Sequence, residues 1–221
     1  MPDKQTKKLS RREREREAHR RELLEAGERV FVRNGYHATT VEEIASEADF
    51  AVGTVYNFFK GKEDLYIHVI EKIAQNFTEQ FEQNVLSIED PEQAIASLIE
   101  LRLTHFEDHR GFFRIFFEAA PGSRLDPAGA LPVNCAGLYE QYMEAVIEIF
   151  RRGVSQRVFD ESDPLYLALC LEGVVNAFVA YWSKREPTEP LAVRVEKMKR
   201  EFLGRIKRRL DDEQQQFPKL S

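Results

Sequence analysis

Several features that would indicate an enzyme, a secreted protein or a metalloprotein are scarce in this sequence. The chain has two cysteines, Cys135 and Cys170, which excludes a disulfide framework and favours buried, reduced thiols. No apolar run near the amino terminus has the form of a signal peptide. No HExxH, CxxC, GxGxxG or phosphate-loop pattern occurs. The sequence therefore predicts a cytoplasmic protein that is not an enzyme and uses no cofactor.

Strand-like alternation of apolar and polar residues is also missing, as are internal repeats. Apolar residues recur instead at steps of three and four, which is the period of one helical face. The sequence therefore predicts an all-α protein whose length suits one or two domains. The expected helices cover residues 14–34, 41–48, 51–59, 62–85, 91–106, 134–152, 164–184 and 191–210, with a Pro/Gly-rich loop at 121–132.

Residues 39–66, TTVEEIASEADFAVGTVYNFFKGKEDLY, predict two short helices, a tight turn and the start of a third helix. Thr40 and Glu43 have the spacing of a capping box, and Asp49 at the turn tolerates a positive φ. The second short helix, AVGTVYNFF, should bury Val52, Val55 and Phe59. Its outward face is small, hydrogen-bonding and aromatic, which suits a DNA groove better than a core; it consists of Gly53, Thr54, Tyr56, Asn57 and Lys60.

Positive charge is concentrated at one end of the chain. Residues 1–21 contain nine Lys or Arg and four Asp or Glu, although the whole chain has a net charge of −6. A basic arm beside an acidic body is expected where one end of a protein meets phosphates. A solvated tail is the alternative, because most charge runs interact only with water.

From Phe31 to Leu65 the run FVRNGYHATTVEEIASEAD…GTVYNFFKGKEDL resembles the TetR/AcrR family of transcriptional regulators. The resemblance implies an N-terminal three-helix helix-turn-helix DNA-binding domain and a larger C-terminal helical domain for ligand binding and dimerisation. The expected divisions are a basic arm at 1–21, the DNA-binding domain at 22–61 and the regulatory domain at 62–221, linked by helix 62–85. The motif depends on the spacing of Gly35, Tyr36, Thr39, Thr40, Ile44, Ala45, Gly53, Tyr56, Phe59, Lys62 and Leu65.

Within this motif, different residue types suit different DNA contacts. Thr54 and Asn57 are the expected base readers, because Asn bonds adenine bidentately and Thr offers a hydroxyl and a methyl group. Tyr56 should bond a phosphate, although packing against the first helix is an alternative. Gly53 should allow close approach to the duplex. Thr40, Lys60 and Lys62 are expected to contact phosphates, and simple solvation is the alternative for the two lysines. Ala51 and Val52 are expected to contact thymine methyl groups.

The family resemblance also implies a homodimer that binds a palindromic operator in double-stranded DNA, usually represses, and is released by a small molecule. Helices 164–184 and 191–210 are the expected dimer contact. Residues 165–182 are apolar nearly all round and approach the length of a membrane span, but Glu172 and Asn176 lie in the middle. Burial against the core and a second subunit is therefore expected, with no membrane contact.

Aromatic residues are dense between residues 95 and 182, which suggests a pocket for a hydrophobic or aromatic effector. Ordinary core packing is the alternative for any one of them. Glu172 and Asn176, one helical turn apart, should orient a polar group of the effector, or bond each other and a partner subunit. The other expected pocket residues are Phe106, Phe113, Phe116, Phe117, Tyr139 and Tyr142.

Two further classes remain open on sequence alone. His105 and His109 lie four residues apart on one helix and could share a metal, which would suit a metal-responsive regulator or a helical metal-dependent enzyme. A solvated or capping role is the favoured interpretation of this pair, so no metal site is assigned. A helical interaction module that binds no DNA is the other alternative, and the salt dependence of DNA binding distinguishes it.

Overall fold

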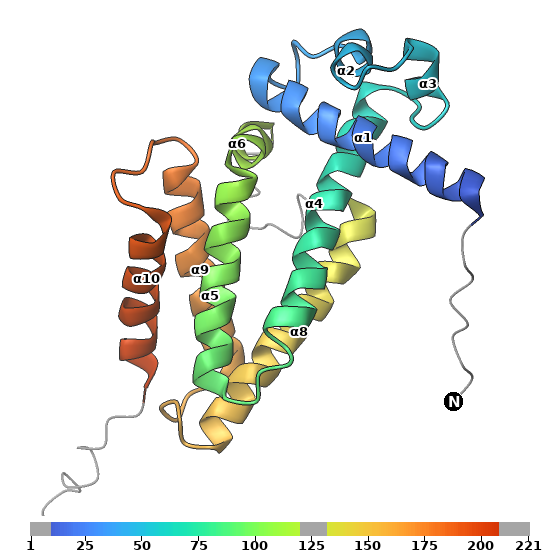
Figure 1. Ribbon diagram of the computed structural model, residues 1–221. Helices are drawn as coiled ribbons and strands as arrows, with labels where there is room; N and C mark the ends of the chain where they lie inside the picture. Colours follow the sequence, from blue (N-terminus) through green and yellow to red (C-terminus); the bar gives the residue numbers. More distant parts are fainter. Residues whose placement is uncertain (1–9, 120–131, 208–221) are drawn as a thin grey trace, which may run out of the picture. The chain divides into compact units, whose positions relative to one another are not determined.

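The computed structural model describes residues 10–119 and 132–207 (Figure 1). Within these ranges every regular element is an α-helix, apart from one isolated bridge between Phe159 and Lys207. The predicted all-α class is confirmed. The chain divides into two compact units, Met1–Ile73 and Ala74–Ser221. The predicted loop at 121–132 lies almost wholly outside the described residues, as does the start of the basic arm.

The first unit contains α1 (Arg11–Asn34), α2 (Val41–Glu47), α3 (Val52–Tyr56) and the first half of α4 (Lys62–Asn84). Its core is small, and α1 packs closely on α4 at Gly27. A Cβ atom built at Gly27 would lie 2.4 Å from Leu65 Cδ2, so any larger residue here would force the Leu65 side chain to move. The fully buried apolar side chains of this core are Leu23, Val30, Phe31, Ile44, Val55 and Leu65.

Helix α1 begins at Arg11, three residues before the predicted start at 14, because a capping box lies at its amino end. The Ser10 amide donates to the Glu13 carboxylate at 2.7 Å, and the Glu13 amide donates to the Ser10 hydroxyl at 3.2 Å. The Ser10 backbone hydrogen bond, followed by that of its hydroxyl, lowers the pKa of Glu13. Residues 11–21 of the predicted arm are therefore helical, and α1 presents their charges on a rigid rod.

The two units divide within α4 rather than at the predicted boundary between 61 and 62. The first three turns of α4 complete the core of the first unit, since Leu65 and Val69 are fully buried. The ring of Tyr66 lies 5.1 Å from that of Phe31, edge to face. The motif KEDL therefore belongs structurally with α1 to α3, and α4 contributes residues to both units.

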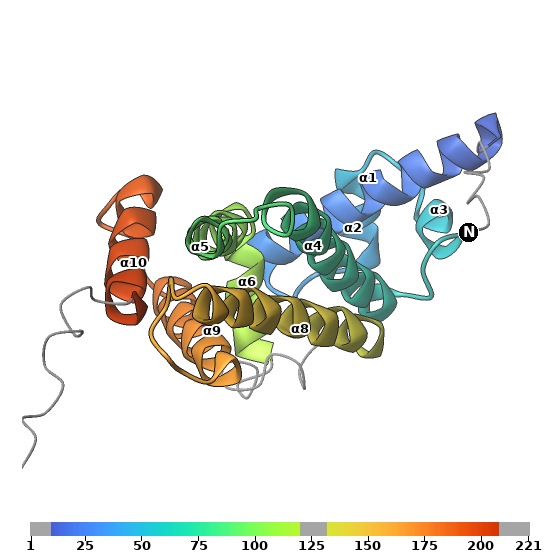
Figure 2. The same ribbon diagram turned by 90° about the horizontal axis from the view of Figure 1, so that it is seen from below.

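The second unit contains the rest of α4 with α5 (Pro91–Asp108), α6 (Arg110–Ala119), α8 (Val133–Ser155), α9 (Pro164–Trp182) and α10 (Leu191–Ile206). Helix α5 packs against α6, α8, α9 and α10, and the view along the helices in Figure 2 shows this arrangement. Helix α10 buries Val195, Met198 and Phe202 along one side.

Helix α9 buries one side and leaves the other uncovered in this chain. Its inner side includes Leu171, Glu172 and Val175, all at most 4% exposed. Among the helices of the described residues, only α9 is long and apolar enough to cross a membrane, judged by length and composition. Only 28% of its apolar stretch is buried within the chain. The uncovered side carries large apolar groups, namely Leu165, Tyr166, Leu169, Val174, Phe178 and Tyr181.

Candidate nucleic-acid interface and ligand chamber

Helix α3 is anchored by two buried side chains and presents the rest of its surface outward. Val55 is fully buried and Phe59, just after the helix, is 2% exposed. The helix ends at Tyr56, earlier than the predicted 59, and the Asn57 amide closes it by donating to the Gly53 carbonyl at 3.2 Å. Tyr56 is 54% exposed, so its side chain is not packed away against α1. Of the other predicted contacts, Ala51, Gly53, Asn57 and Lys60 are exposed, and Val52 and Thr54 are half-buried.

The start of α2 and the turn that follows this helix both have the predicted chemistry. The Thr40 amide donates to the Glu43 carboxylate at 2.9 Å and the Glu43 amide donates to the Thr40 hydroxyl at 3.2 Å, which confirms the capping box. Asp49 has a φ of 59°, the positive value that the turn requires. Thr40 is exposed at the amino end of α2. Local sequence therefore accounts for the start of α2 and for the turn after it.

The structure gives Lys62 a different role from the predicted phosphate contact. Its ammonium donates to the carbonyl oxygens of Tyr36, His37 and Thr39 at 2.9, 3.1 and 2.9 Å, and it lies 4.9 Å from the centre of the Tyr36 ring. The loop before α2 leaves these carbonyls outside any helix, and the lysine satisfies them. Since all three ammonium donors have acceptors, this geometry favours Lys62 as a clamp on the loop.

Replacing Lys62 with methionine should destabilise the first unit. The variant keeps an unbranched side chain but removes three charge-assisted hydrogen bonds from a half-buried site, so we expect a loss of about 1–3 kcal/mol of unfolding free energy. Hydrogen exchange of the α2 amides measures this locally. Lys60→Met is the matched control, because Lys60 is exposed. Equal α2 protection in the two variants would contradict the clamp.

The amino-terminal half of α1 is held beside α3 by ring contacts (Figures 1 and 2). The guanidinium of Arg16 lies 5.6 Å from the centre of the Phe58 ring, and that of Arg20 lies 5.7 Å from the centre of the Phe59 ring. Phe58 was not among the predicted DNA contacts. The packing places Arg16 and Arg20 next to the segment that follows α3. The exposed arginines of this part of α1 are Arg11, Arg12, Arg14, Arg16 and Arg21.

The predicted pocket aromatics form one continuous cluster in the second unit. Ring centres lie 5.7 Å apart for Phe106 and Phe113 and 6.1 Å apart for Phe113 and Phe117. Tyr139 and Tyr142 lie 6.1 Å apart, and Phe116 lies 5.9 Å from Phe117. We use the name aromatic chamber for this cluster of packed rings. Two rings from α4 that were not among the predicted pocket residues also join it: the ring centres of Phe77 and Phe81 lie 5.5 and 5.0 Å from that of Tyr142.

A half-buried arginine from α5, Arg102, connects the polar groups beside the aromatic chamber. Arg102 Nη1 lies 2.9 Å from Glu172 Oε2 and 3.2 Å from the Tyr142 hydroxyl, and its Nη2 donates to Asn176 Oδ1 at 2.7 Å. The Tyr142 hydroxyl donates to the other Glu172 oxygen. We call these four residues the polar cluster. The two predicted polar residues are therefore brought together, and each bonds an arginine that sequence reasoning did not single out.

Protonation of the polar cluster follows from burial and from the ion pair. Burial raises the pKa of the Tyr142 phenol well above its usual value, with the neighbouring Glu172 carboxylate adding to the shift, so the hydroxyl stays protonated. Burial opposes the charge of Arg102, but Glu172 and Tyr142 together outweigh this effect, so the pKa of Arg102 rises. The cluster therefore contains a cation beside a carboxylate and a neutral phenol.

The histidine pair does not have the solvated character expected from the sequence. His105 is 7% exposed among Phe77, Phe113 and His109, and only His109 has the capping position at the end of α5. Across the described ranges no group of three or more His, Cys, Asp or Glu could hold a metal. The pair alone therefore gives the metal-responsive alternative too few ligands within that part of the chain.

Burial, with smaller contributions from His109 and Arg102, lowers the pKa of His105 to about 3. An unfolded histidine has a pKa of about 6.5, so between these values the unfolded chain binds the extra proton and stability falls as pH falls. His105→Phe should therefore reduce the acid loss of unfolding free energy between pH 6.5 and 5 by up to about 2 kcal/mol. Urea titrations followed by Trp182 fluorescence measure this. Above pH 7.5 the unfolding free energies of the two proteins should change with pH in parallel. Equal slopes of unfolding free energy against pH below pH 6.5 would refute the lowered pKa of His105.

Comparison with known proteins agrees with this architecture. Residues 23–69 match the family described as bacterial regulatory proteins, tetR family. The chain is 26% identical over 169 residues to the uncharacterised HTH-type transcriptional regulator YhgD of Bacillus subtilis, covering 75% of this chain and 84% of that protein. It is 30% identical over 103 residues to the HTH-type transcriptional activator FasR of Mycolicibacterium smegmatis, covering 47% of each.

The fold as a whole is similar to solved structures. The regulator FadR of Bacillus subtilis, solved in complex with stearoyl-CoA, has a TM-score of 0.66 and 19% sequence identity. The similarity covers 84% of this chain and 98% of that one. It therefore extends through both units and not only through the matched residues 23–69.

Proposed function

We propose that this chain is a transcriptional regulator of the TetR family, whose model matches residues 23–69, and that it binds a palindromic operator as a homodimer. A small hydrophobic or aromatic effector releases it, and it acts as a repressor in the cytoplasm. The observation that supports this most directly is the outward surface of α3, anchored by Val55 and Phe59. In a dimer, the two copies of α3 would enter successive major grooves about 34 Å apart.

The outward surface of α3 offers two kinds of DNA contact. Asn57 and Thr54 read base edges in the major groove, with Ala51 and Val52 against thymine methyl groups. Tyr56 and Lys60 bond phosphates, and the exposed arginines of α1 neutralise the backbone beside them. Gly53 carries no side chain, and a Cβ built there meets nothing within 4 Å, so it leaves room for the duplex.

Two substitutions separate base reading from docking. Asn57→Ala should reduce discrimination by about 1–3 kcal/mol at one operator position, because a bidentate amide contact is lost. Tyr56→Phe should instead weaken binding to all operator variants alike, since only a phosphate contact is removed. Fluorescence anisotropy over a panel of single-base operator variants, identified first by footprinting upstream DNA, measures both. Identical profiles for the two variants would refute these roles.

Salt dependence tests DNA binding itself. The logarithm of the binding constant should fall with the logarithm of salt concentration, with a slope of about −0.9 for each phosphate neutralised. Replacing Arg12 and Arg14 by glutamine should make this slope shallower, because both side chains are exposed at the free end of α1. A flat salt dependence would instead favour an interaction module that binds no DNA.

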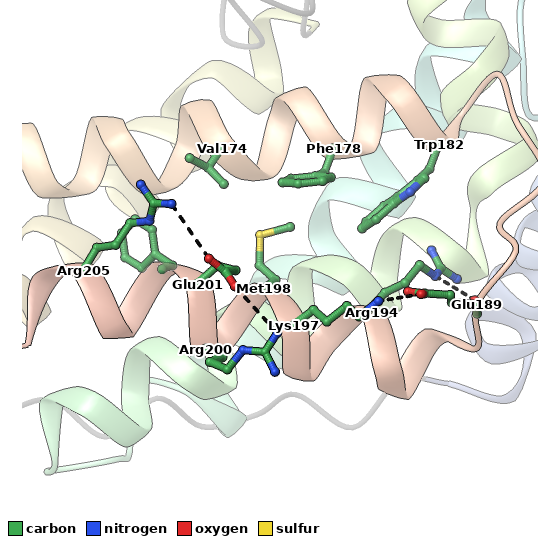
Figure 3. A pocket seen from close by; sticks show the side chains of 11 residues that line it. Val174, Phe178, Trp182, Glu189, Arg194, Lys197, Met198, Arg200, Glu201 and Arg205 are labelled. Atoms are coloured by element: carbon green, nitrogen blue, oxygen red, sulfur yellow. Dashed lines mark hydrogen bonds and ion pairs between the residues drawn. The ribbon is translucent and has the colours of Figure 1, made fainter.

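The uncovered side of α9 supports dimerisation through α9 and α10. A groove of about 530 Å³ lies between these helices (Figure 3), with Val174, Phe178 and Met198 among its apolar lining residues. Charged side chains border it, including Arg200 and Glu201, which pair at 3.6 Å. An apolar floor with a polar rim is the usual anatomy of a protein interface. A second copy of α9 is the occupant we propose.

The aromatic chamber supports an effector site, and α4 supports its coupling to DNA. Phe77 and Phe81 lie in the chamber, whereas Lys62 and Leu65 of the same helix lie in the DNA-binding unit. A ligand that moves α4 would shift operator affinity, typically by 1–3 kcal/mol. Calorimetry with operator present tests this proposal. Effectors that bind without changing operator affinity would refute the coupling.

A further inference from the structure

Arg16 and Arg20, which lie one turn apart on α1, place their guanidinium groups over aromatic rings and not beside acids. Helical spacing puts a carboxylate three residues before each of them. Within the part of the chain that the structure describes, neither arginine forms an ion pair. The guanidinium of Arg16 lies instead 5.6 Å from the centre of the Phe58 ring. The side chain of Arg16 is therefore held by a contact that leaves its charge without a carboxylate partner.

The contact with the ring leaves the hydrogen-bond donors of Arg16 available. A guanidinium held over a ring keeps the N–H groups at its edge for other partners, and their planar arrangement matches the oxygen atoms of a phosphate. Glu13, three residues before Arg16, is occupied elsewhere, because its carboxylate accepts from the Ser10 amide at 2.7 Å. An anion from outside the chain is therefore the expected partner of Arg16.

Phe58 places this charge beside the outward surface of α3. It lies between Asn57 and Lys60 in sequence, and both of these residues are exposed. A hollow of about 440 Å³ adjoins Phe58 and is lined by two arginines and two glutamates, namely Arg16, Arg20, Glu13 and Glu17. Because these four charges balance, the hollow should not collect small anions on its own. A phosphate that arrives with DNA docked on α3 is the anion that fits this position.

We propose that Phe58 is a positioning residue for DNA binding, whose ring holds Arg16 so that the guanidinium bonds a backbone phosphate beside the bases that α3 reads. This inference rests on the proposed function and adds to it a residue that acts through Arg16. Holding a long side chain in place before binding lowers the cost of ordering it, so the contact increases affinity for DNA of any sequence. Base discrimination by Asn57 should not depend on Phe58.

A double-mutant cycle on the full-length protein tests this role. Phe58→Leu keeps an apolar side chain but removes the ring, so DNA binding should weaken about two- to fivefold, the size of an exposed cation–π contact. In an Arg16→Gln background the same change should have less than about a 1.5-fold effect, because the side chain that Phe58 positions is gone. Arg14→Gln is the matched control background. Within the described ranges Arg14 is exposed and contacts no ring, so Phe58→Leu should keep its full effect there.

Fluorescence anisotropy with an operator duplex and with a duplex of unrelated sequence, measured over a range of salt concentrations, gives all of these affinities. Arg16→Gln should make the salt slope shallower by about 0.9 for both duplexes, the value for one phosphate. Phe58→Leu should weaken both duplexes alike, so the ratio of the two affinities should stay within about twofold of wild type. Equal effects of Phe58→Leu in the wild-type and Arg16→Gln backgrounds would overturn the inference, as would a loss confined to the operator or no loss at all.

The duplex of unrelated sequence keeps this inference separate from the proposed function. If wild type prefers no upstream sequence, the proposed operator fails, while the cycle on the unrelated duplex still decides the role of Phe58. If wild type prefers an operator and the effects of Phe58→Leu and Arg16→Gln are simply additive, only the inference fails. Absence of binding to either duplex would overturn both. Circular dichroism confirms that each variant used is folded.

Discussion

Replacing Glu172 with alanine should lower the free energy of unfolding of the second unit by about 3–5 kcal/mol. The substitution leaves the Arg102 guanidinium beside a cavity without its carboxylate partner. It also removes the acceptor of the Tyr142 hydroxyl, a phenol that is 6% exposed. An uncompensated buried charge is among the few changes that cost this much. Urea unfolding followed by the fluorescence of Trp182, the sole tryptophan of the chain, reports on this unit.

The double variant Arg102→Met/Glu172→Met is the control for that result. It removes both charges and fills the space with apolar groups, so its unfolding free energy should lie within about 1–2 kcal/mol of wild type. The remaining loss comes from the Tyr142 hydroxyl and the Asn176 amide, which keep fewer partners. If Glu172→Ala and the double variant were equally unstable, packing rather than charge would explain the loss.

The local features of the fold could be predicted from sequence because their causes are local. The capping box of Thr40 and Glu43, the positive φ of Asp49 and the buried stripe of α10 all depend on residues within a few positions of one another. The start of α1 was missed although its signal, Ser10 followed by Glu13, was present. The charge pattern of residues 1–21 was interpreted as a basic arm, so the capping box of Ser10 and Glu13 within it was not recognised as a helix start.

The roles of Lys62 and Arg102 could not be predicted in the same way, because their partners are remote in sequence. Lys62 bonds carbonyls 23 to 26 residues earlier, and Arg102 bonds side chains 40 to 74 residues later. Periodicity shows which face of a helix is apolar. It does not show which distant side chain pairs with a polar residue that lies on that apolar face. Glu172 and Asn176 were recognised as exceptions, and only tertiary packing identifies the arginine between them.

The uncovered side of α9 makes one substitution decisive for the proposed dimer. Leu169 is 52% exposed on that side, so glutamate there costs little in folding the single chain. In a dimer, the same glutamate would be buried against a second copy across a twofold axis, where two like charges and their desolvation oppose association. Leu169→Glu should therefore give monomers, measured by sedimentation equilibrium at micromolar concentration.

Loss of the dimer should also remove most operator affinity. Two linked reading units bind a palindrome more tightly than one by about 10²–10⁴-fold, since the second contact is made at high effective concentration. Leu169→Glu should lose affinity by that factor, while Leu86→Glu, the same change at another exposed leucine that is 42% exposed, should not. A Leu169→Glu protein that stays dimeric and binds operator normally would show that α9 is not the interface. Since α9 leaves its large apolar groups uncovered in the single chain, that outcome would require another partner for this side of the helix.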